Sequence, residues 1–104
     1  MTVTTDRLEY TIKTPWGVAD HYENLGQGIF TVCTPSHGGI FVPYEMLHCI
    51  PEEQRLEAAK WSGSEQWYEE DCCWAFVAVA FPDHFRPKVV EHAKTVIAGY
   101  FGKD

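Results

Sequence analysis

The chain has 104 residues, of which 45% are hydrophobic and 14% aromatic, so it can form a single domain with one core over residues 1–104. No apolar run reaches the roughly 20 residues that cross a bilayer, and the N-terminal residues lack the basic and apolar segments of a secretory signal. We therefore expect a cytoplasmic protein that does not insert into membranes.

The net charge is −7, and residues 45–91 hold ten acidic residues against four Lys or Arg. This excess of acids argues against direct nucleic-acid binding, which needs clustered Lys and Arg, and permits a protein partner with a basic surface.

The first 42 residues are predicted to form an antiparallel meander of three to four short strands. Leu8–Lys13 alternates apolar and polar residues, and Ile29–Thr34 is rich in β-branched residues, which are both typical of strands. Turns are predicted where Pro and Gly occur together, at Thr14–Gly17 and Pro35–Gly39. The expected strands are Leu8–Lys13, Val18–Leu25, Ile29–Thr34 and Ile40–Val42.

From Pro43 onward the pattern changes to helices. Glu69, Glu70 and Asp71 would occupy the first turn of a buried helix, where the helix dipole favours acids, and Pro82 would end it. The expected helices are Pro43–Cys49, Pro51–Lys60, Tyr68–Phe81 and Lys88–Phe101. Strands followed by helices predict an α+β domain in which three to four helices pack on one face of an antiparallel sheet.

The four cysteines are even in number, but their arrangement does not indicate disulfides. Cys72 and Cys73 are adjacent, and adjacent cysteines rarely bridge each other. Without a secretory signal, reduced and mostly buried thiols are expected at Cys33, Cys49, Cys72 and Cys73.

Three motifs occur in a fixed order along the chain. They are Thr14-Pro15-Trp16-Gly17, Ser36-His37-Gly38-Gly39 and Trp67-Tyr68-Glu69-Glu70-Asp71-Cys72, the last followed by Trp74. Over roughly residues 14–101 this order resembles a family of small uncharacterised domains found in bacteriophages, plasmids and bacteria. The resemblance implies an association with mobile elements, whose small accessory proteins often counter host defences. It also implies that the matching residues carry whatever role the family has, and these are His37, Glu69, Glu70, Asp71, Cys72 and Trp74.

A metal site would need ligands from distant segments of the chain. Cys33 and His37 are four residues apart, and further ligands would have to come from Glu69–Cys73. The paired C-x₂₋₄-C spacing of structural zinc sites is absent. Cys33 and Cys73 also depart from the residues usual in the resembled family, which argues against a shared set of cysteine ligands. We expect no metal and no cofactor.

An enzyme would be centred on His37. Cys72, at the start of the predicted helix, could be a nucleophile with His37 as its base. The adjacent acids oppose this, since negative charge raises the pKa of a thiol. Alternatively, His37 would share acid–base work with one carboxylate among Glu69, Glu70 and Asp71.

A binding function, unlike catalysis, does not require that particular side chains from separate segments converge in one site. Aromatic residues surrounded by acids suit contact with a basic partner. The candidate binding residues are Trp61, Glu65, Trp67, Tyr68, Glu69, Glu70, Asp71 and His37. We expect a small acidic protein of the host cytoplasm that inhibits a host defence complex, such as a CRISPR effector or a restriction enzyme. The alternatives are the enzyme centred on His37 and an accessory module with no defence role.

Overall fold

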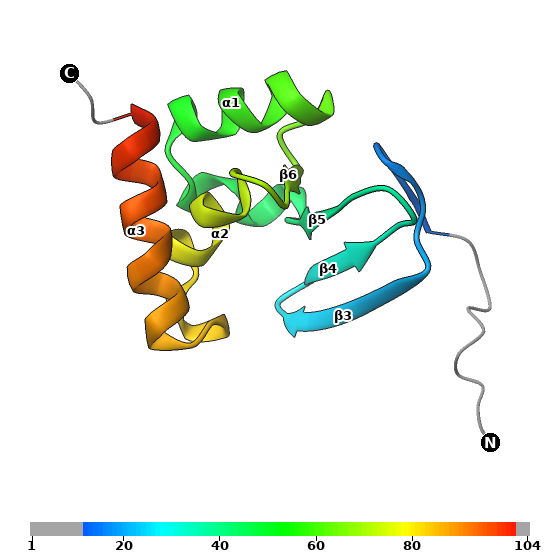
Figure 1. Ribbon diagram of the computed structural model, residues 1–104, viewed down its shortest axis with the longest axis horizontal. Coiled ribbons are helices and arrows are strands. Elements are labelled where there is room, and N and C mark those ends of the chain that lie inside the picture. Colours follow the sequence, from blue (N-terminus) through cyan, green and yellow to red (C-terminus); the bar gives the residue numbers. More distant parts are fainter. Residues whose placement is uncertain (1–11, 102–104) are drawn as a thin grey trace.

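The computed structural model describes residues 12–101 and has the expected α+β architecture (Figure 1). In chain order the elements are β1 (Lys13–Thr14), β2 (Gly17–Val18), β3 (His21–Gly26), β4 (Ile29–Cys33), β5 (Gly38–Phe41), the 3₁₀ helix η1 (Tyr44–Cys49), α1 (Glu52–Ser62), β6 (Trp67–Glu69), α2 (Trp74–Ala80), the 3₁₀ helix η2 (Pro82–His84) and α3 (Pro87–Phe101). Within this part of the chain, no helix has both the length and the apolar character that crossing a membrane requires.

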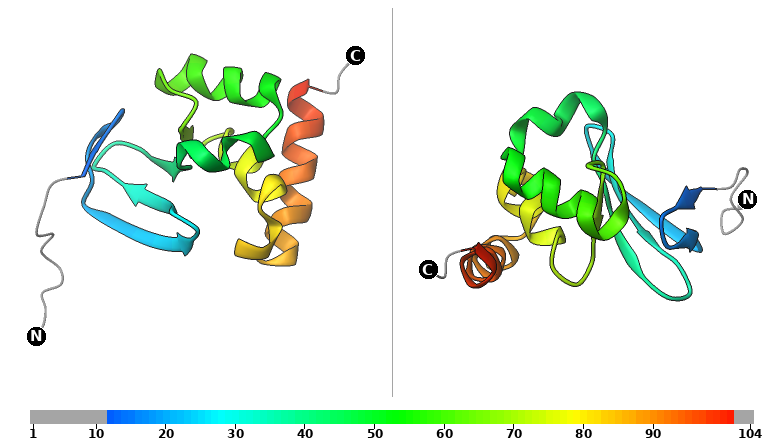
Figure 2. Two further views of the ribbon diagram at one scale, coloured as in Figure 1. Left: turned by 180° about the vertical axis from the view of Figure 1, so that it is seen from behind. Right: turned by 90° about the horizontal axis from the view of Figure 1, so that it is seen from above.

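The main sheet has four antiparallel strands in the order β3-β4-β5-β6, and β1 and β2 form a separate small hairpin. Strand β6 comes after helix α1, yet it returns to pair with β5, placing Gly39 opposite Glu69, Ile40 opposite Tyr68 and Phe41 opposite Trp67. The helices gather around β5 and β6, whereas β3 and β4 extend away from them (Figures 1 and 2).

Most of the expected elements are present. The strand over Ile29–Thr34 and the helices over Pro51–Lys60 and Lys88–Phe101 are confirmed within one or two residues at each end. The helix expected over Pro43–Cys49 is a 3₁₀ helix, and the strand expected over Val18–Leu25 is divided between β2 and β3. The strand expected over Ile40–Val42 begins two residues earlier. Most of the strand expected over Leu8–Lys13 lies outside the described residues.

The helix expected over Tyr68–Phe81 is wrong in its first part. Trp67–Glu69 form strand β6, the next four residues form turns, and α2 begins only at Trp74 with no acid in its first turn. The edge of β5 would otherwise leave its N–H and C=O groups unpaired, and pairing with β6 satisfies them. This long-range pairing outweighs the local preference of acids for a helix start.

The two faces of the sheet are both covered, but by different groups. On the helix side, fully buried Ile29, Tyr68 and Phe76 belong to the main core, and the Tyr68 and Phe76 rings meet edge to face with centroids 6.5 Å apart. Side chains alternate along a strand, so Trp67 and Glu69 point to the opposite face from Tyr68. On that opposite face the aromatic rings of Trp16, Tyr22, Phe30, Phe41 and Trp67 pack against one another.

Gly39 is the point at which the three sequence motifs meet. A Cβ atom at this position would lie 2.3 Å from Cη2 of Trp16 and 2.6 Å from the carbonyl oxygen of Tyr68. At Gly38 a Cβ would lie 2.8 Å from the Val32 carbonyl oxygen and 3.0 Å from Oε1 of Glu70. The absence of side chains here therefore allows the Trp16 ring and the β6 strand to approach the backbone of β5.

We expect Gly39→Ala to lower the free energy of unfolding by about 2 kcal/mol, because the new methyl group must displace the Trp16 ring or the β6 backbone. Gly99→Ala is the matched control, since nothing lies within 4 Å of a Cβ built there. In helix α3 that change should raise stability by about 0.5 kcal/mol. Urea denaturation of the two variants measures both effects. Equal stability of Gly39→Ala and the parent would contradict the close approach at Gly39.

Candidate functional site

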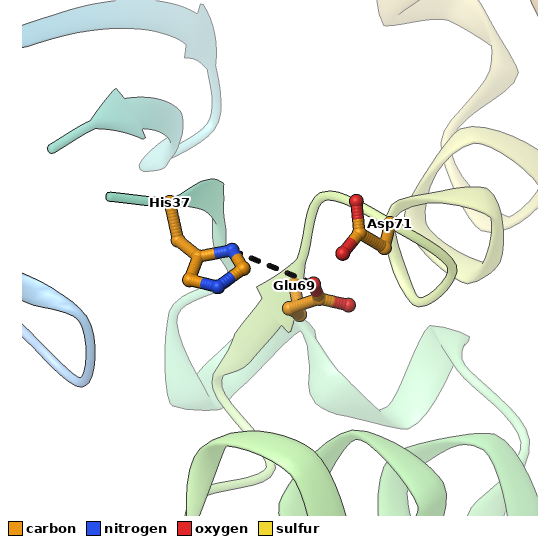
Figure 3. Close-up of side chains that lie close together, drawn as sticks. All are labelled: His37, Glu69 and Asp71. Carbon is orange, nitrogen blue, oxygen red and sulfur yellow. Dashed lines mark ion pairs between the residues drawn. The ribbon is translucent and has the colours of Figure 1, made fainter. Parts of the chain in front are cut away.

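The expected site residues His37, Glu69 and Asp71 come together at the end of strands β5 and β6. His37 directly precedes β5, Glu69 is the last residue of β6, and Asp71 lies in the turn that follows (Figure 3). One ligand atom from each of the three side chains lies within 4.8 Å of the others. Nδ1 of His37 is 3.9 Å from Oε2 of Glu69 and 3.8 Å from Oε2 of Glu70. The His37 turn and the acidic segment, 32 residues apart at His37 and Glu69, thus form one cluster.

The backbone of this cluster is held by hydrogen bonds on both sides. The Thr34 hydroxyl donates to the His37 carbonyl at 2.6 Å and accepts from the His37 N–H at 3.0 Å, which closes the turn before β5. The Glu70 N–H donates to the Gly38 carbonyl at 3.0 Å, which extends the pairing of β5 and β6 by one step. The positions of His37 and the acids are therefore set by the sheet.

Glu69 is the inner member of the cluster and the other acids are exposed. Its residue is 7% exposed, and it is the buried charged residue among those described. Burial raises the pKa of the Glu69 carboxyl, the neighbouring Asp71 carboxyl raises it further, and the backbone N–H groups of Asp71 and Cys72 act in the opposite direction. Glu70 and Asp71 face solvent.

Cys72 lies beside Glu69 but is poorly suited to be a nucleophile. Its Sγ is 3.9 Å from Oε1 of Glu69 and 3.6 Å from Sγ of Cys73. Burial, with the Glu69 carboxylate nearby, raises the pKa of the Cys72 thiol. Cys72 lies in the turn that follows β6, two residues before the first residue of α2. A raised pKa disfavours the thiolate that a catalytic nucleophile needs, so the electrostatics at Cys72 are wrong for that role.

The cysteines are free, as expected, but their burial differs from the expectation. Cys33 and Cys49 are exposed, Cys72 is half-buried and Cys73 is fully buried. The prediction of mostly buried thiols is wrong for the first two, because Cys33 is the last residue of strand β4 and Cys49 ends a 3₁₀ helix, and both side chains face solvent there.

The candidate binding residues do not form the single exposed patch that their sequence order suggests. Tyr68 is fully buried, Glu69 is nearly so, and Trp67 is half-buried among the aromatic rings of the sheet. Trp61 is 57% exposed on α1. Glu65 pairs with Arg55 at 3.1 Å. The exposed acids next to His37 and the exposed Trp61 are what remains available to a partner.

Two residues that sequence reasoning missed connect Trp61 to this cluster. The Trp61 indole N–H donates to Oε2 of Glu57 at 2.9 Å and lies 3.0 Å from the Tyr100 hydroxyl, which itself donates to Glu57. The Tyr100 hydroxyl also acts to lower the pKa of the Cys72 thiol, and Cys72 lies beside Glu69. The i,i+4 spacing of Glu57 and Trp61 was visible in the sequence, but the contact with Tyr100 spans 43 residues and had no sequence signal.

A separate pocket of about 530 Å³ lies away from His37. Its lining residues are Tyr44, Glu45, Leu47, His48, Arg55 and Glu65. Arg55 donates to the Ile50 carbonyl at 2.5 Å and to Glu65, so the cation in this pocket already has partners. The pocket holds no group of the histidine cluster.

We expect iodoacetamide to alkylate Cys33 and Cys49 first, Cys72 more slowly, and Cys73 only after unfolding, because exposure falls in that order and burial raises the pKa of the Cys72 and Cys73 thiols. Peptide mass spectrometry over a time course measures the four rates, and urea-unfolded protein provides the control in which all four react. Fastest reaction at Cys72 would indicate an activated nucleophile.

We expect Tyr100→Phe to lower the free energy of unfolding by about 1 kcal/mol near neutral pH, because Glu57 loses a hydrogen bond. That hydrogen bond is the main reason why the pKa of Glu57 lies below its ordinary value. A lowered folded-state pKa stabilises the fold above the unfolded-state pKa, and this contribution disappears as the pH falls through the folded-state pKa. Urea denaturation should therefore show the parent and variant converging in acid, whereas Tyr22→Phe on exposed β3 should change little at any pH.

The model of a domain of unknown function, DUF7007, matches residues 9–103. No curated protein and no solved structure matches the chain. The matched range covers nearly the whole chain and includes the three motifs that meet at β5 and β6. The chain therefore belongs to the DUF7007 family, a family of domains of unknown function.

Proposed function

We propose that the protein acts by binding a protein partner with a basic surface, in the cytoplasm of a host cell. In the most specific form of this proposal, the protein belongs to a mobile element and its partner is a host defence complex, such as a CRISPR effector or a restriction enzyme. The observation that carries the proposal is an exposed tryptophan together with a group of exposed acids that no Lys or Arg neutralises within the described chain.

The acids beside His37 carry an uncompensated charge. In residues 12–101 the Lys and Arg side chains that form ion pairs do so with Glu65, Glu57 and Glu91, and none reaches Glu70 or Asp71. Surface charge of one sign increases the encounter rate with a surface of the opposite sign. The net charge of −7 acts in the same direction.

Trp61 supports the proposal as an anchor residue. Tryptophan is enriched among the residues that dominate the binding energy of interfaces. The indole of Trp61 is fixed by Glu57 while over half of its surface remains exposed. Binding would therefore cost little side-chain entropy at this position.

The two parts of this surface are joined by side-chain contacts. From Trp61 they pass through Tyr100 to Cys72, and from Cys72 to Glu69, which is 3.9 Å from His37. A single partner that covered this side of the molecule could contact both the tryptophan and the acids.

The convergence of His37 with Glu69 favours a second candidate function, acid–base catalysis. A carboxyl with a raised pKa next to an exposed imidazole is an arrangement that proton transfer uses. This alternative needs a substrate to reach His37, and it retains Glu69 rather than Cys72 as the second group.

The test is affinity capture with the full chain from host cells that carry defence systems, followed by measurement of the dissociation constant with the purified partner. We expect Glu70→Lys combined with Asp71→Lys to weaken binding at least about tenfold, because both charges then repel the basic surface. Trp61→Ala should cost about 2 kcal/mol of binding energy, and raised salt should weaken the complex.

Glu91→Lys combined with Asp83→Lys is the matched control, since both acids are exposed and the change in net charge is identical. Affinity that is equal in the two double variants, or indifferent to salt, would contradict the electrostatic form of the proposal. A partner without a role in defence would support the accessory alternative.

A further inference from the structure

We propose that His37, Glu69 and Asp71 bind one divalent transition-metal ion. Figure 3 shows the three side chains gathered at the end of β6, and one ligand atom from each lies within 4.8 Å of the other two. The sequence offers His37 and the acidic segment as possible metal ligands but predicts no metal, because the ligands come from two segments and lack any recognised spacing. The inference does not depend on the proposed protein partner.

The donor set selects the class of metal. One imidazole nitrogen with two carboxylate oxygens suits Zn²⁺, Mn²⁺ or Fe²⁺, whereas Mg²⁺ and Ca²⁺ prefer oxygen ligands alone. Three protein ligands leave at least one coordination position for water or an exogenous group. His37 and Asp71 are exposed, so that position would be open to solvent or to a partner.

The distances require only a small adjustment. Metal–ligand bonds of about 2.1 Å in a tetrahedral site place the ligand atoms roughly 3.4 Å apart. The observed separations, 3.9 Å between His37 and Glu69 and at most 4.8 Å in the set, are larger than this. The exposed side chains of His37 and Asp71 can rotate toward Glu69, which is held by its neighbours.

Glu69 gives the site its fixed point. It lies in register with Gly39, and the Trp16 ring packs directly over that glycine, so the Glu69 backbone is anchored in the sheet. In the described residues no Lys or Arg forms an ion pair with this buried carboxylate. A buried carboxylate that no Lys or Arg compensates is costly, and a bound metal ion would offset that cost.

Two other polar side chains, Glu70 and Cys72, lie next to the cluster but are not among the proposed ligands. Glu70, whose Oε2 is 3.8 Å from Nδ1 of His37, is an exposed competitor for the imidazole. Cys72 lies 3.9 Å from Glu69 on the side of the other carboxylate oxygen, Oε1, and does not belong to the three-residue set. Without a metal ion, Nδ1 of His37 lies within 4 Å of a carboxylate oxygen of both Glu69 and Glu70.

The experiment is calorimetric titration of the full chain, freed of metal with a chelator, with Zn²⁺ and Mn²⁺ separately. We expect one ion per chain, and little binding of Mg²⁺ or Ca²⁺ at the same concentrations. His37→Ala, Glu69→Gln and Asp71→Asn should each weaken binding roughly 10–100-fold, because each removes a ligand. Circular dichroism of each variant establishes that it is folded. If Glu69→Gln does not fold, Asp71→Asn still tests the site, because Asp71 is exposed and its replacement leaves the core unchanged.

His48→Ala is the matched control. His48 and Cys49 are exposed and their Nε2 and Sγ atoms are 3.6 Å apart, so they could capture Zn²⁺ without any role for His37. The proposal predicts unchanged binding in this variant. It also predicts that Mn²⁺ broadens the amide NMR signals of residues 36–39 and 68–72 before others. Loss of binding only in His48→Ala, broadening elsewhere, or no ion bound by the folded parent would overturn the proposal.

Discussion

The structure depends on the approach of three backbone segments around Gly39. With no side chain there, the Trp16 ring packs over the centre of β5 and strand β6 pairs along its edge. Each of the three motifs contributes one part of this contact, which explains in physical terms why they stand together in one chain. Trp16 and Trp67, with ring centroids 5.8 Å apart, then close the face of the sheet away from the helices. The small domain thus gains a second, aromatic layer in addition to its main core.

The same contact determines the chemistry of the site. Because Glu69 is paired opposite Gly39, its carboxylate is buried at the end of the sheet, while the chain turns sharply and leaves Glu70 and Asp71 in solvent. A buried carboxylate that lacks a Lys or Arg in the described chain reduces stability. Groups that cost stability are concentrated at functional positions. Glu69, rather than the more conspicuous Cys72, is the residue around which both the catalytic alternative and the metal site are built.

Helix α3 contributes to the candidate surface through one residue. Tyr100 reaches Glu57 on α1 and Cys72 beside the histidine cluster, so it joins the exposed Trp61 to the acids. A ligand from a protein partner could fill the open coordination position of a metal ion bound at His37. The proposed metal site would then be part of the proposed interface, although neither proposal requires the other.

The sequence by itself determined the α+β class, the strand at Ile29–Cys33, the helices α1 and α3, the free state of the cysteines and membership of a family of unknown function. These features follow from local periodicity, turn residues and motif order. It also singled out His37, Glu69 and Asp71, but left open whether the His37 turn lies next to the acids. Only the tertiary structure decided that Trp67–Glu69 form a strand, because the partner that makes a strand favourable there is the edge of β5, which lies far away in sequence. That pairing buries Tyr68 and Glu69 and brings His37 to the acids, since strand pairing is a long-range interaction that local sequence preferences do not encode.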